Sequence, residues 1–137
     1  MRVSVTSLLL AMVFFFCGCR LTDVEKDSKE RTAIRPNASL VDGVVTSLDI
    51  VDSLRYKVSM RVLNSRSVGS LVSLVEAGQH VVALPQFMLN EDGRVDGSYE
   101  RNRRLLEVRA ARPGDTVSVK IALAADGRWM VLDKAQR

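Results

Sequence analysis

Histidine, cysteine and aromatic residues are scarce in this sequence, and their scarcity excludes much of enzyme chemistry. The 137 residues include one histidine and two cysteines, and only 5% are aromatic. A zinc site needs three or four His, Cys or carboxylate ligands, and the chain offers no such cluster at metal-ligand spacing. It also has no Gly-x-Ser-x-Gly nucleophile elbow and no phosphate-binding Gly-x-x-x-x-Gly-Lys loop. We therefore expect no metal, no cofactor and no catalytic residues.

Long apolar runs are also missing. The unbroken apolar run Leu8–Phe16 is too short to cross a bilayer, which takes about 20 apolar residues. It follows the positively charged Arg2 and has the length of the apolar region of a signal peptide. The length of the rest of the chain allows one domain, because domains usually have about 50–200 residues.

The apolar run ends in Phe16-Cys17-Gly18-Cys19, and here the sequence resembles bacterial lipoproteins. Their motif places a large apolar residue at −3, a small residue at −1 and the lipidated Cys at +1, which here are Phe16, Gly18 and Cys19. The resemblance covers about the first 20 residues. It implies that residues 1–18 are a signal peptide and that Cys19 carries a diacylglyceryl group, usually with a further acyl chain. Two or more chains anchor a protein stably in a membrane. An ordinary cleaved signal peptide and an uncleaved N-terminal helix are the alternatives.

The same resemblance implies a location in the cell envelope. Arg20 follows Cys19, whereas lipoproteins retained at the inner membrane of Gram-negative cells usually have Asp there, so the outer membrane is favoured for such a source. Cys17 would leave with the signal peptide and Cys19 would be capped, which removes thiol and disulfide chemistry from the mature chain. Arg2 is the one charged residue in 1–18, and without it the net charge falls from +4 to +3.

Beyond Cys19 the sequence predicts a tether followed by one β-rich domain. Residues 19–39 are polar and mixed in charge, which is typical of a flexible tether. Residues 40–137 contain two segments, Tyr56–Val62 and Thr116–Leu123, in which apolar and polar residues alternate as in strands with one buried face. Shorter runs rich in Val and Leu predict further strands at 41–50, 80–87 and 128–133. Asp-Gly pairs, which favour turns, occur at 42–43, 92–93, 96–97 and 126–127, and the last pair predicts a hairpin.

A single helix is predicted between the third and fourth strands. Ser98–Ala111 contains good helix formers, with Leu105, Leu106 and Ala110 able to share a face, and Pro113-Gly114 would end the helix with a type II turn. Five strands with a helix at this position resemble the OB-fold, a small Greek-key barrel. The segments that carry the resemblance open the first, third and fourth strands: Val41–Val45, Gly78–Val81 and Gly114–Val117.

We therefore predict a mainly β, five-stranded OB-like barrel at residues 40–137, with a small β-sandwich as the alternative. The predicted core consists of Val45, Leu48, Val58, Met60, Val62, Val82, Leu84, Leu106, Val117, Val119, Ile121, Leu123 and Val131. Trp129 is interpreted as an anchor of the barrel and not as a surface for stacking a ligand.

The candidate site residues in the domain are one histidine and a cluster of arginines. A lone histidine such as His80, at the start of a strand, is more often structural than catalytic. The cluster comprises Arg101, Arg103, Arg104, Arg109 and Arg112. It could meet phosphates, an acidic partner or an anionic lipid surface. Because Glu100 and Glu107 are interspersed, we favour the interpretation that it is the solvated side of a helix.

Two other patterns are interpreted as structural. The acidic segment Asn90–Gly97 does not match the spacing of an EF-hand loop, and Arg94 stands where a ligand is needed, so it is interpreted as a polar loop with two Asp-Gly turns. Met60, Met88 and Met130 could suggest copper binding, but they are not clustered, and Met60 falls on a core-facing position.

Together these patterns predict a non-enzymatic, lipid-anchored cell-envelope protein whose domain binds or assembles an envelope component. The expected partners are the membrane, through Cys19, and an envelope protein or glycan. Single-stranded nucleic acid needs a basic groove with stacking aromatics, so no nucleic-acid partner is expected. The alternative is an envelope enzyme or metal-handling protein that uses His80 and nearby carboxylates. A third hypothesis is a structural lipoprotein without a ligand.

Overall fold

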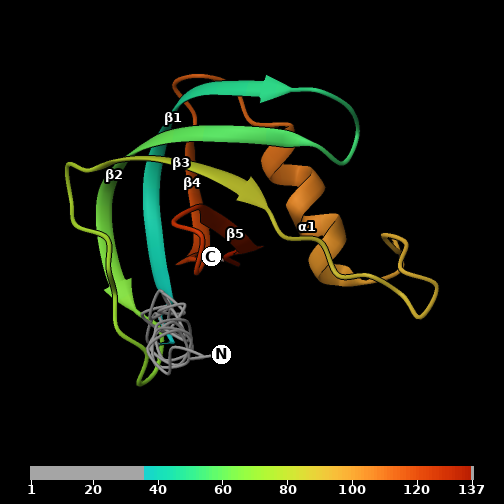
Figure 1. Cartoon of the computed structure of the whole chain (residues 1–137). Helices are drawn as coiled ribbons and strands as arrows, with labels where there is room; N and C mark the ends of the chain where they lie inside the picture. The colour runs from blue at the N-terminus through green and yellow to red at the C-terminus, as the bar shows by residue number, and fades with distance from the viewer. Residues whose placement is uncertain (1–35, 137) are drawn as a thin grey trace, which may run out of the picture. The chain divides into compact units, whose positions relative to one another are not determined.

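The computed structural model describes residues 36–136, which fold into five strands and one helix (Figure 1). The elements are β1 (Ser39–Ile50), β2 (Tyr56–Ser67), β3 (His80–Pro85), α1 (Glu100–Arg109), β4 (Thr116–Leu123) and β5 (Trp129–Lys134). Each strand lies where the alternation or the apolar runs predict one, and α1 lies within the predicted helix. The signal peptide 1–18, Cys19 and the tether up to residue 35 lie outside the described residues.

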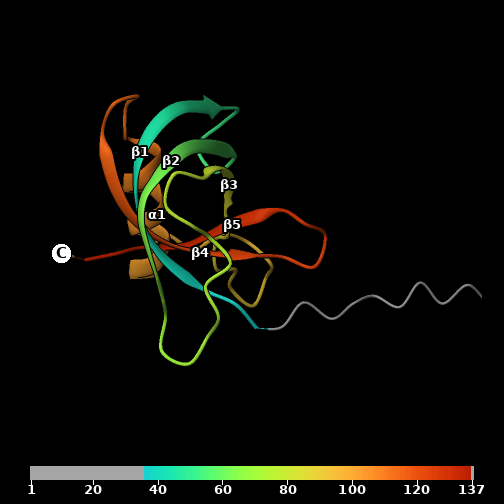
Figure 2. The ribbon, with the colours of Figure 1, turned by 90° about the vertical axis from the view of Figure 1, so that its left-hand side faces the viewer.

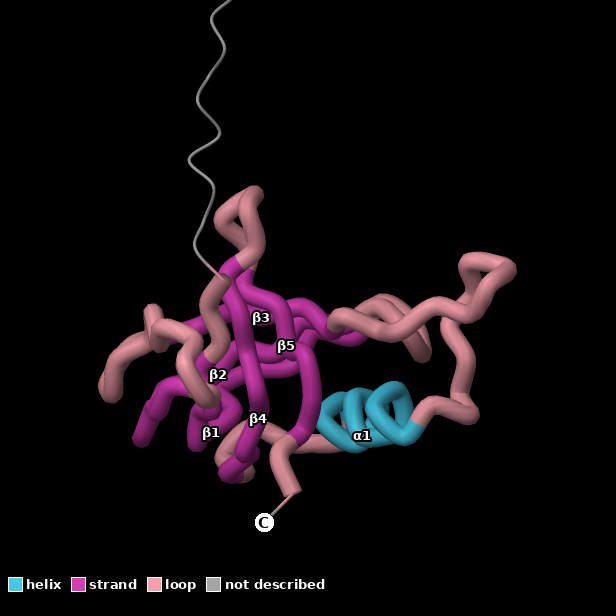
Figure 3. Tube along the Cα trace, turned by 90° about the horizontal axis from the view of Figure 1, so that it is seen from below, coloured by secondary structure: helices cyan, strands magenta, loops and turns pink. Residues whose placement is uncertain are grey.

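The strands close into a barrel with the order β1-β2-β3-β5-β4, in which β4 returns to pair with β1. All neighbours are antiparallel except β3 and β5, which run parallel over three residue pairs. Figure 3 shows the strands wrapped around one interior, with α1 lying against one side of the barrel beside β5. A closed barrel with its helix between the third and fourth strands confirms the OB-like prediction and excludes the sandwich.

The predicted hairpin between the last two strands is confirmed. Ala124 and Arg128 are joined by a backbone hydrogen bond of 2.9 Å, and Gly127 takes a positive φ of 81° that suits glycine. At the other end of β4, the N–H of Asp115 donates to the carbonyl of Arg112 at 3.0 Å, with Pro113 and the positive-φ Gly114 between them. This is the predicted type II turn.

Asp42-Gly43 is not a turn, contrary to the prediction from its Asp-Gly sequence. The pair lies inside β1, at a shift in the β1–β2 register where β2 carries the additional residue Leu63. Here the backbones approach closely, because a Cβ on Gly43 would lie 3.2 Å from both the carbonyl oxygen of Arg61 and the sulfur of Met60. Glycine is therefore present for close approach at a bulge, which lets β1 bend and pair with both β2 and β4.

Most of the predicted core is buried, but the predicted face of β3 is wrong. Val82 is 50% exposed, and its neighbours Val81 and Ala83 enter the core instead. Because four successive residues from Val81 to Leu84 are apolar, alternation could not assign the inward face. Leu48, Leu84, Leu106 and Leu123 are half-buried, and Val41, Tyr56 and Val75 belong to the core without having been predicted.

The buried face of α1 also differs from the prediction. Leu105 and Val108 join the core, whereas Leu106 is half-buried and Ala110 is exposed. The third buried residue of the helix is polar: the Asn102 amide accepts from the Met88 N–H at 2.8 Å and donates to the carbonyl oxygens of Met88 and Asp96 at 2.8 and 2.7 Å. These bonds explain why an amide occupies a core position, since a buried polar group must be satisfied.

The close approach at Gly43 predicts a cost for any side chain there. We expect Gly43→Ala to lower the free energy of unfolding by about 1–3 kcal/mol, the usual cost of overpacking a core. Gly97→Ala is the matched control, because no atom lies within 4 Å of its added Cβ and its φ is not positive. Urea unfolding followed by circular dichroism measures both variants. Equal stability of the two would contradict the role assigned to Gly43.

Candidate functional site

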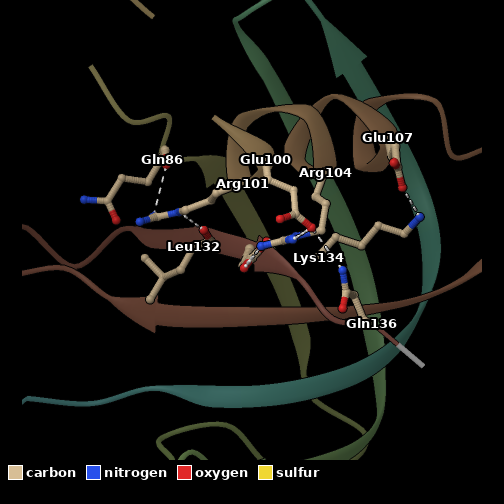
Figure 4. Close-up of polar contacts among 9 residues, drawn as sticks. Gln86, Glu100, Arg101, Arg104, Glu107, Leu132, Lys134 and Gln136 are labelled. Atoms are coloured by element: carbon tan, nitrogen blue, oxygen red, sulfur yellow. Dashed lines mark hydrogen bonds and ion pairs between the residues drawn. The ribbon is translucent and has the colours of Figure 1, made fainter. Parts of the chain in front are cut away.

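The arginine cluster is divided by the structure into different environments. Two of its members, Arg101 and Arg104, extend from α1 to β5 and bind that strand (Figure 4). The Arg101 Nε donates to the carbonyl oxygen of Leu132, and its guanidinium also donates to the carbonyl of Gln86 at 3.2 Å. Leu132 is the additional residue at the shift in the β4–β5 register, so the sheet leaves its carbonyl for the arginine.

Arg104 forms the stronger of the two attachments. Its guanidinium donates two bonds of 2.8 Å to the carboxylate of Asp133 on β5 and one of 2.5 Å to Glu100 on its own helix. The side chains of Arg104 and Asp133 are only 21% and 28% exposed. Such a bidentate pair fixes orientation as well as distance, and the bonds to Asp133 raise the pKa of Arg104 above its ordinary value. Arg101 and Arg104 therefore attach the helix to the barrel.

The other three arginines have different surroundings. Arg103 and Arg112 are exposed, and in the described part of the chain neither side chain forms an ion pair. Arg109 ends the helix and is half-buried, with a buried Nε that has no hydrogen-bond partner within residues 36–136. The solvated-face interpretation thus describes Arg103 and Arg112 but not Arg101 or Arg104, whose role as a structural attachment was not predicted.

A groove of about 1090 Å³ lies between α1, the start of β4 and the residues after β5. Its charged lining is balanced, with the acids Glu100, Glu107 and Asp115 and the bases Arg103, Arg104 and Lys134. Figure 4 shows Lys134 reaching Glu107 from the opposite wall, at 2.6 Å, and Gln136 reaching Glu100. Because three acids face three bases and most of them pair within the described residues, the groove does not concentrate charge of one sign.

A second surface, on the outer side of β1, β2 and β3, contains His80. The imidazole Nε2 lies 3.1 Å from the hydroxyl of Thr46 on β1. Since β2 lies between β1 and β3 in the sheet, this contact crosses over β2. Arg61 on β2 is directly opposite His80 in the register and is exposed. His80 is therefore an exposed residue of the sheet surface, in contact with a hydroxyl and beside a cation.

Further outward residues extend this surface. We call it the β1–β3 face and define it by Thr46, Lys57, Ser59, Arg61, His80 and Val82. The β2 members alternate with the core residues Val58 and Met60, which points them outward. Among residues 36–136, no carboxylate lies within ion-pair distance of Lys57 or Arg61. Lys57 and Arg61 occupy polar positions of the Tyr56–Val62 alternation. That alternation could have identified them as outward-facing cations, but they were not among the predicted site residues.

The acidic segment Asn90–Gly97 is a loop, as predicted, and the structure shows that its own side chains hold it. The Asn90 side-chain oxygen accepts from the N–H groups of Asp92 and Arg94 at 3.1 and 2.9 Å. Asp96 accepts from the N–H of Ser98 at 2.7 Å, a bond that lowers the pKa of its carboxyl. Over the described range 36–136, no three His, Cys, Asp or Glu side chains gather as metal ligands. Met60 is buried, which agrees with core filling.

Three aromatic side chains, Tyr56, Phe87 and Trp129, lie in the core or pack against it. Tyr56 is buried, and its hydroxyl donates to the carbonyl of Leu105 in α1 at 2.6 Å. Burial raises the pKa of this hydroxyl above its ordinary value. Trp129 and Phe87 are half-buried and pack against the core, in agreement with the interpretation of Trp129 as a barrel anchor.

Comparison with known proteins assigns no family to the chain: no family model, curated protein or solved structure matches it. Within residues 36–136 there is no helix with the length and apolarity needed to span a bilayer.

Arg104, which is bonded to β5, and Arg103, which is exposed, are expected to contribute differently to stability. We expect Arg104→Gln to lower the urea midpoint of unfolding, because it removes the bidentate bond that joins α1 to β5. Arg103→Gln removes the same charge one position earlier on the helix and is expected to leave the midpoint nearly unchanged. The loss in Arg104→Gln should shrink at high salt, which screens ion pairs. A larger loss in Arg103→Gln would contradict the assignment.

Proposed function

We propose that the chain is a lipid-anchored cell-envelope protein whose OB-like barrel is a non-enzymatic binding module for an anionic envelope glycan. The observation that carries the proposal is the β1–β3 face, where Arg61 and Lys57 form no ion pair in the described part of the chain, although Asp49 lies opposite Lys57 in the β1–β2 register. OB-folds that bind oligosaccharides or oligonucleotides use the surface of the second and third strands. The cations of this chain lie on that surface.

The chemistry of the face favours an anionic, hydroxyl-rich ligand. Arg61 offers several N–H donors to a carboxylate or phosphate, and Thr46 and Ser59 add hydroxyls that both donate and accept. Val82 gives a small apolar contact beside Ser59, with which it pairs directly in the β2–β3 register. The strands fix the backbone at these positions, so only the side chains have to become ordered on binding.

Support for the envelope anchor comes from the sequence alone. Arg2, the apolar run Leu8–Phe16 and the Gly18-Cys19 junction have the order of a lipoprotein signal. An anchor on Cys19 would place the domain at a membrane surface, where the partners available are lipids, envelope glycans and envelope proteins.

The enzyme hypothesis has one observation in its favour, the contact between the Thr46 hydroxyl and the His80 imidazole. Nucleophilic catalysis needs such a hydroxyl–base pair, together with a third group that orients the base. In residues 36–136 no carboxylate forms an ion pair with His80, so a group that would orient the imidazole is missing there. We therefore favour binding over catalysis.

The glycan proposal predicts that the cations of the β1–β3 face control affinity. Calorimetric titration with a sulfated oligosaccharide as the probe should show binding that weakens with salt. Arg61→Glu should weaken it about tenfold or more, since it replaces an attractive charge by a repulsive one at the ligand.

Arg112→Glu is the matched control, because it makes the same charge change at an exposed position outside the face. An equal loss of affinity in both variants would show that the effect comes from net charge and not from the β1–β3 face. His80→Ala separates the alternatives: loss of a hydrolytic activity on such a glycan in a variant that still folds would favour the enzyme.

The anchor predicts a specific N-terminus. Mass spectrometry of the protein from the membrane fraction should find a chain that begins at Cys19 and carries two or three acyl chains. Cys19→Ala should abolish the modification and release the protein from the membrane. A soluble, unmodified chain that begins at another residue would contradict the lipoprotein assignment.

A further inference from the structure

One surface of the domain combines exposed apolar side chains with a lack of acidic residues. The segment from Leu63 to Val75 reads Leu-Asn-Ser-Arg-Ser-Val-Gly-Ser-Leu-Val-Ser-Leu-Val. Arg66 is the one charged residue of this segment, which is followed directly by the exposed Glu76. Val72 and Leu74 are 50% and 42% exposed. Apolar residues, serines and a single cation suit the boundary between lipid headgroups and acyl chains, where a carboxylate would be repelled by anionic lipids.

The exposure of Val72 and Leu74 is fixed by the structure. The intervening Ser73 hydroxyl lies 2.9 Å from the hydroxyl of Ser39 and 3.0 Å from that of Ser65, and Val75 is buried in the core. Ser73 and Val75 therefore face inward, and Val72 and Leu74 face outward, as in a strand. The two apolar side chains are presented to solvent by a segment whose other side is bonded to the barrel.

This segment lies beside the first described residues of the chain. Asn37 pairs with Val72 in a parallel bridge, and the N–H of Ala38 donates to the carbonyl of Val72 at 3.2 Å. Figures 1 and 2 both show the connection after β2 next to the start of β1. The chain therefore leaves the barrel toward Cys19 directly beside Val72. The 17 residue steps from Cys19 to Pro36 can span at most about 60 Å, which keeps this end within reach of an anchored N-terminus.

The other exposed apolar group of comparable size has a different character. Ile50, Val51 and Leu54 lie at the tip of the β1–β2 hairpin. The carboxylate of Asp52 stands among them, where it accepts from the N–H groups of Leu54 and Arg55 at 2.9 and 2.8 Å. These bonds hold the pKa of Asp52 below its ordinary value, so its carboxylate stays ionised, and it pairs with Arg55 at 2.6 Å. The tip is also at the end of β1 opposite to Asn37.

We propose that Arg66, Val72 and Leu74 form a membrane-contact surface, through which the anchored domain rests on the lipid bilayer. The inference depends on the proposed lipid anchor on Cys19. Two apolar side chains and one cation bind a membrane weakly by themselves, but an anchor in the same bilayer raises their effective concentration enough to hold them there. In this orientation the β1–β2 tip, at the opposite end of β1, points away from the bilayer.

A fluorescent label tests the proposal in the intact lipidated protein. Val72→Cys and, as the matched control, Val51→Cys each receive a label whose emission shifts to the blue in an apolar environment. The proteins are reconstituted into vesicles of phosphatidylethanolamine with a minority of phosphatidylglycerol, and vesicle-bound protein is collected by flotation. We expect a blue shift, and quenching by lipid-borne nitroxide, at position 72 and not at position 51.

A second substitution assigns the shift to the surface. In the protein labelled at position 72, Leu74→Glu should abolish the blue shift, whereas Leu54→Glu, at a position 39% exposed, should leave it intact. Protein that floats with the vesicles but keeps the label at position 72 in water overturns the membrane-contact surface and leaves the anchor in place. Protein with an intact chain that does not float overturns the anchor, and the surface with it.

Discussion

The barrel depends on the ability of β1 to pair with two partners at once. Its twelve residues run antiparallel to β2 throughout, and its first half, Ser39–Val44, also pairs with β4. A straight strand cannot follow both partners around so small a barrel, so β1 has to bend. The bend occurs where Gly43 lets the backbone of β2 come close and where Leu63 and Thr46 are additional residues in the ladder. Closure of the sheet removes its free edges, which open sheets must protect from pairing with other chains.

The additional residues at the register shifts also determine where several polar side chains make their contacts. The additional residue in β5, Leu132, has a carbonyl that accepts from Arg101. The additional residue in β1, Thr46, contacts His80 across β2. Bulges turn backbone or side-chain groups out of the regular ladder, and a helix or neighbouring strand can then bind them. Arginines on one helix thus become a structural attachment, while the cations of β2 remain available at the surface.

The proposed lipid anchor and membrane-contact surface together orient the domain relative to the membrane. The chain leaves the barrel beside Val72, at the end that carries the proposed membrane-contact surface. The members of the β1–β3 face on β2 pair with Val44–Asp49, in the half of β1 nearer the β1–β2 tip, so a domain held at the bilayer by its base would hold Arg61 and Lys57 away from the lipid. A ligand in the envelope could then reach these cations without displacing the membrane contact.

The number, type and order of the elements could be predicted without the fold, because alternation, turn residues and a stop at Pro113-Gly114 are local signals. The sequence also singled out Cys19, through a motif that needs no fold. Only the tertiary structure decided which side of β3 faces inward, since Val81 to Leu84 are all apolar, and why Asn102 is buried, since its partners Met88 and Asp96 lie in a loop. The fold also distinguishes Arg101 and Arg104 from the exposed arginines. Their partners, a carbonyl at a bulge and a carboxylate, lie on β5 and cannot be inferred from the sequence of α1. The β1–β3 face exists only once three strands lie side by side, which brings Thr46, Arg61 and His80 together from distant positions in the chain.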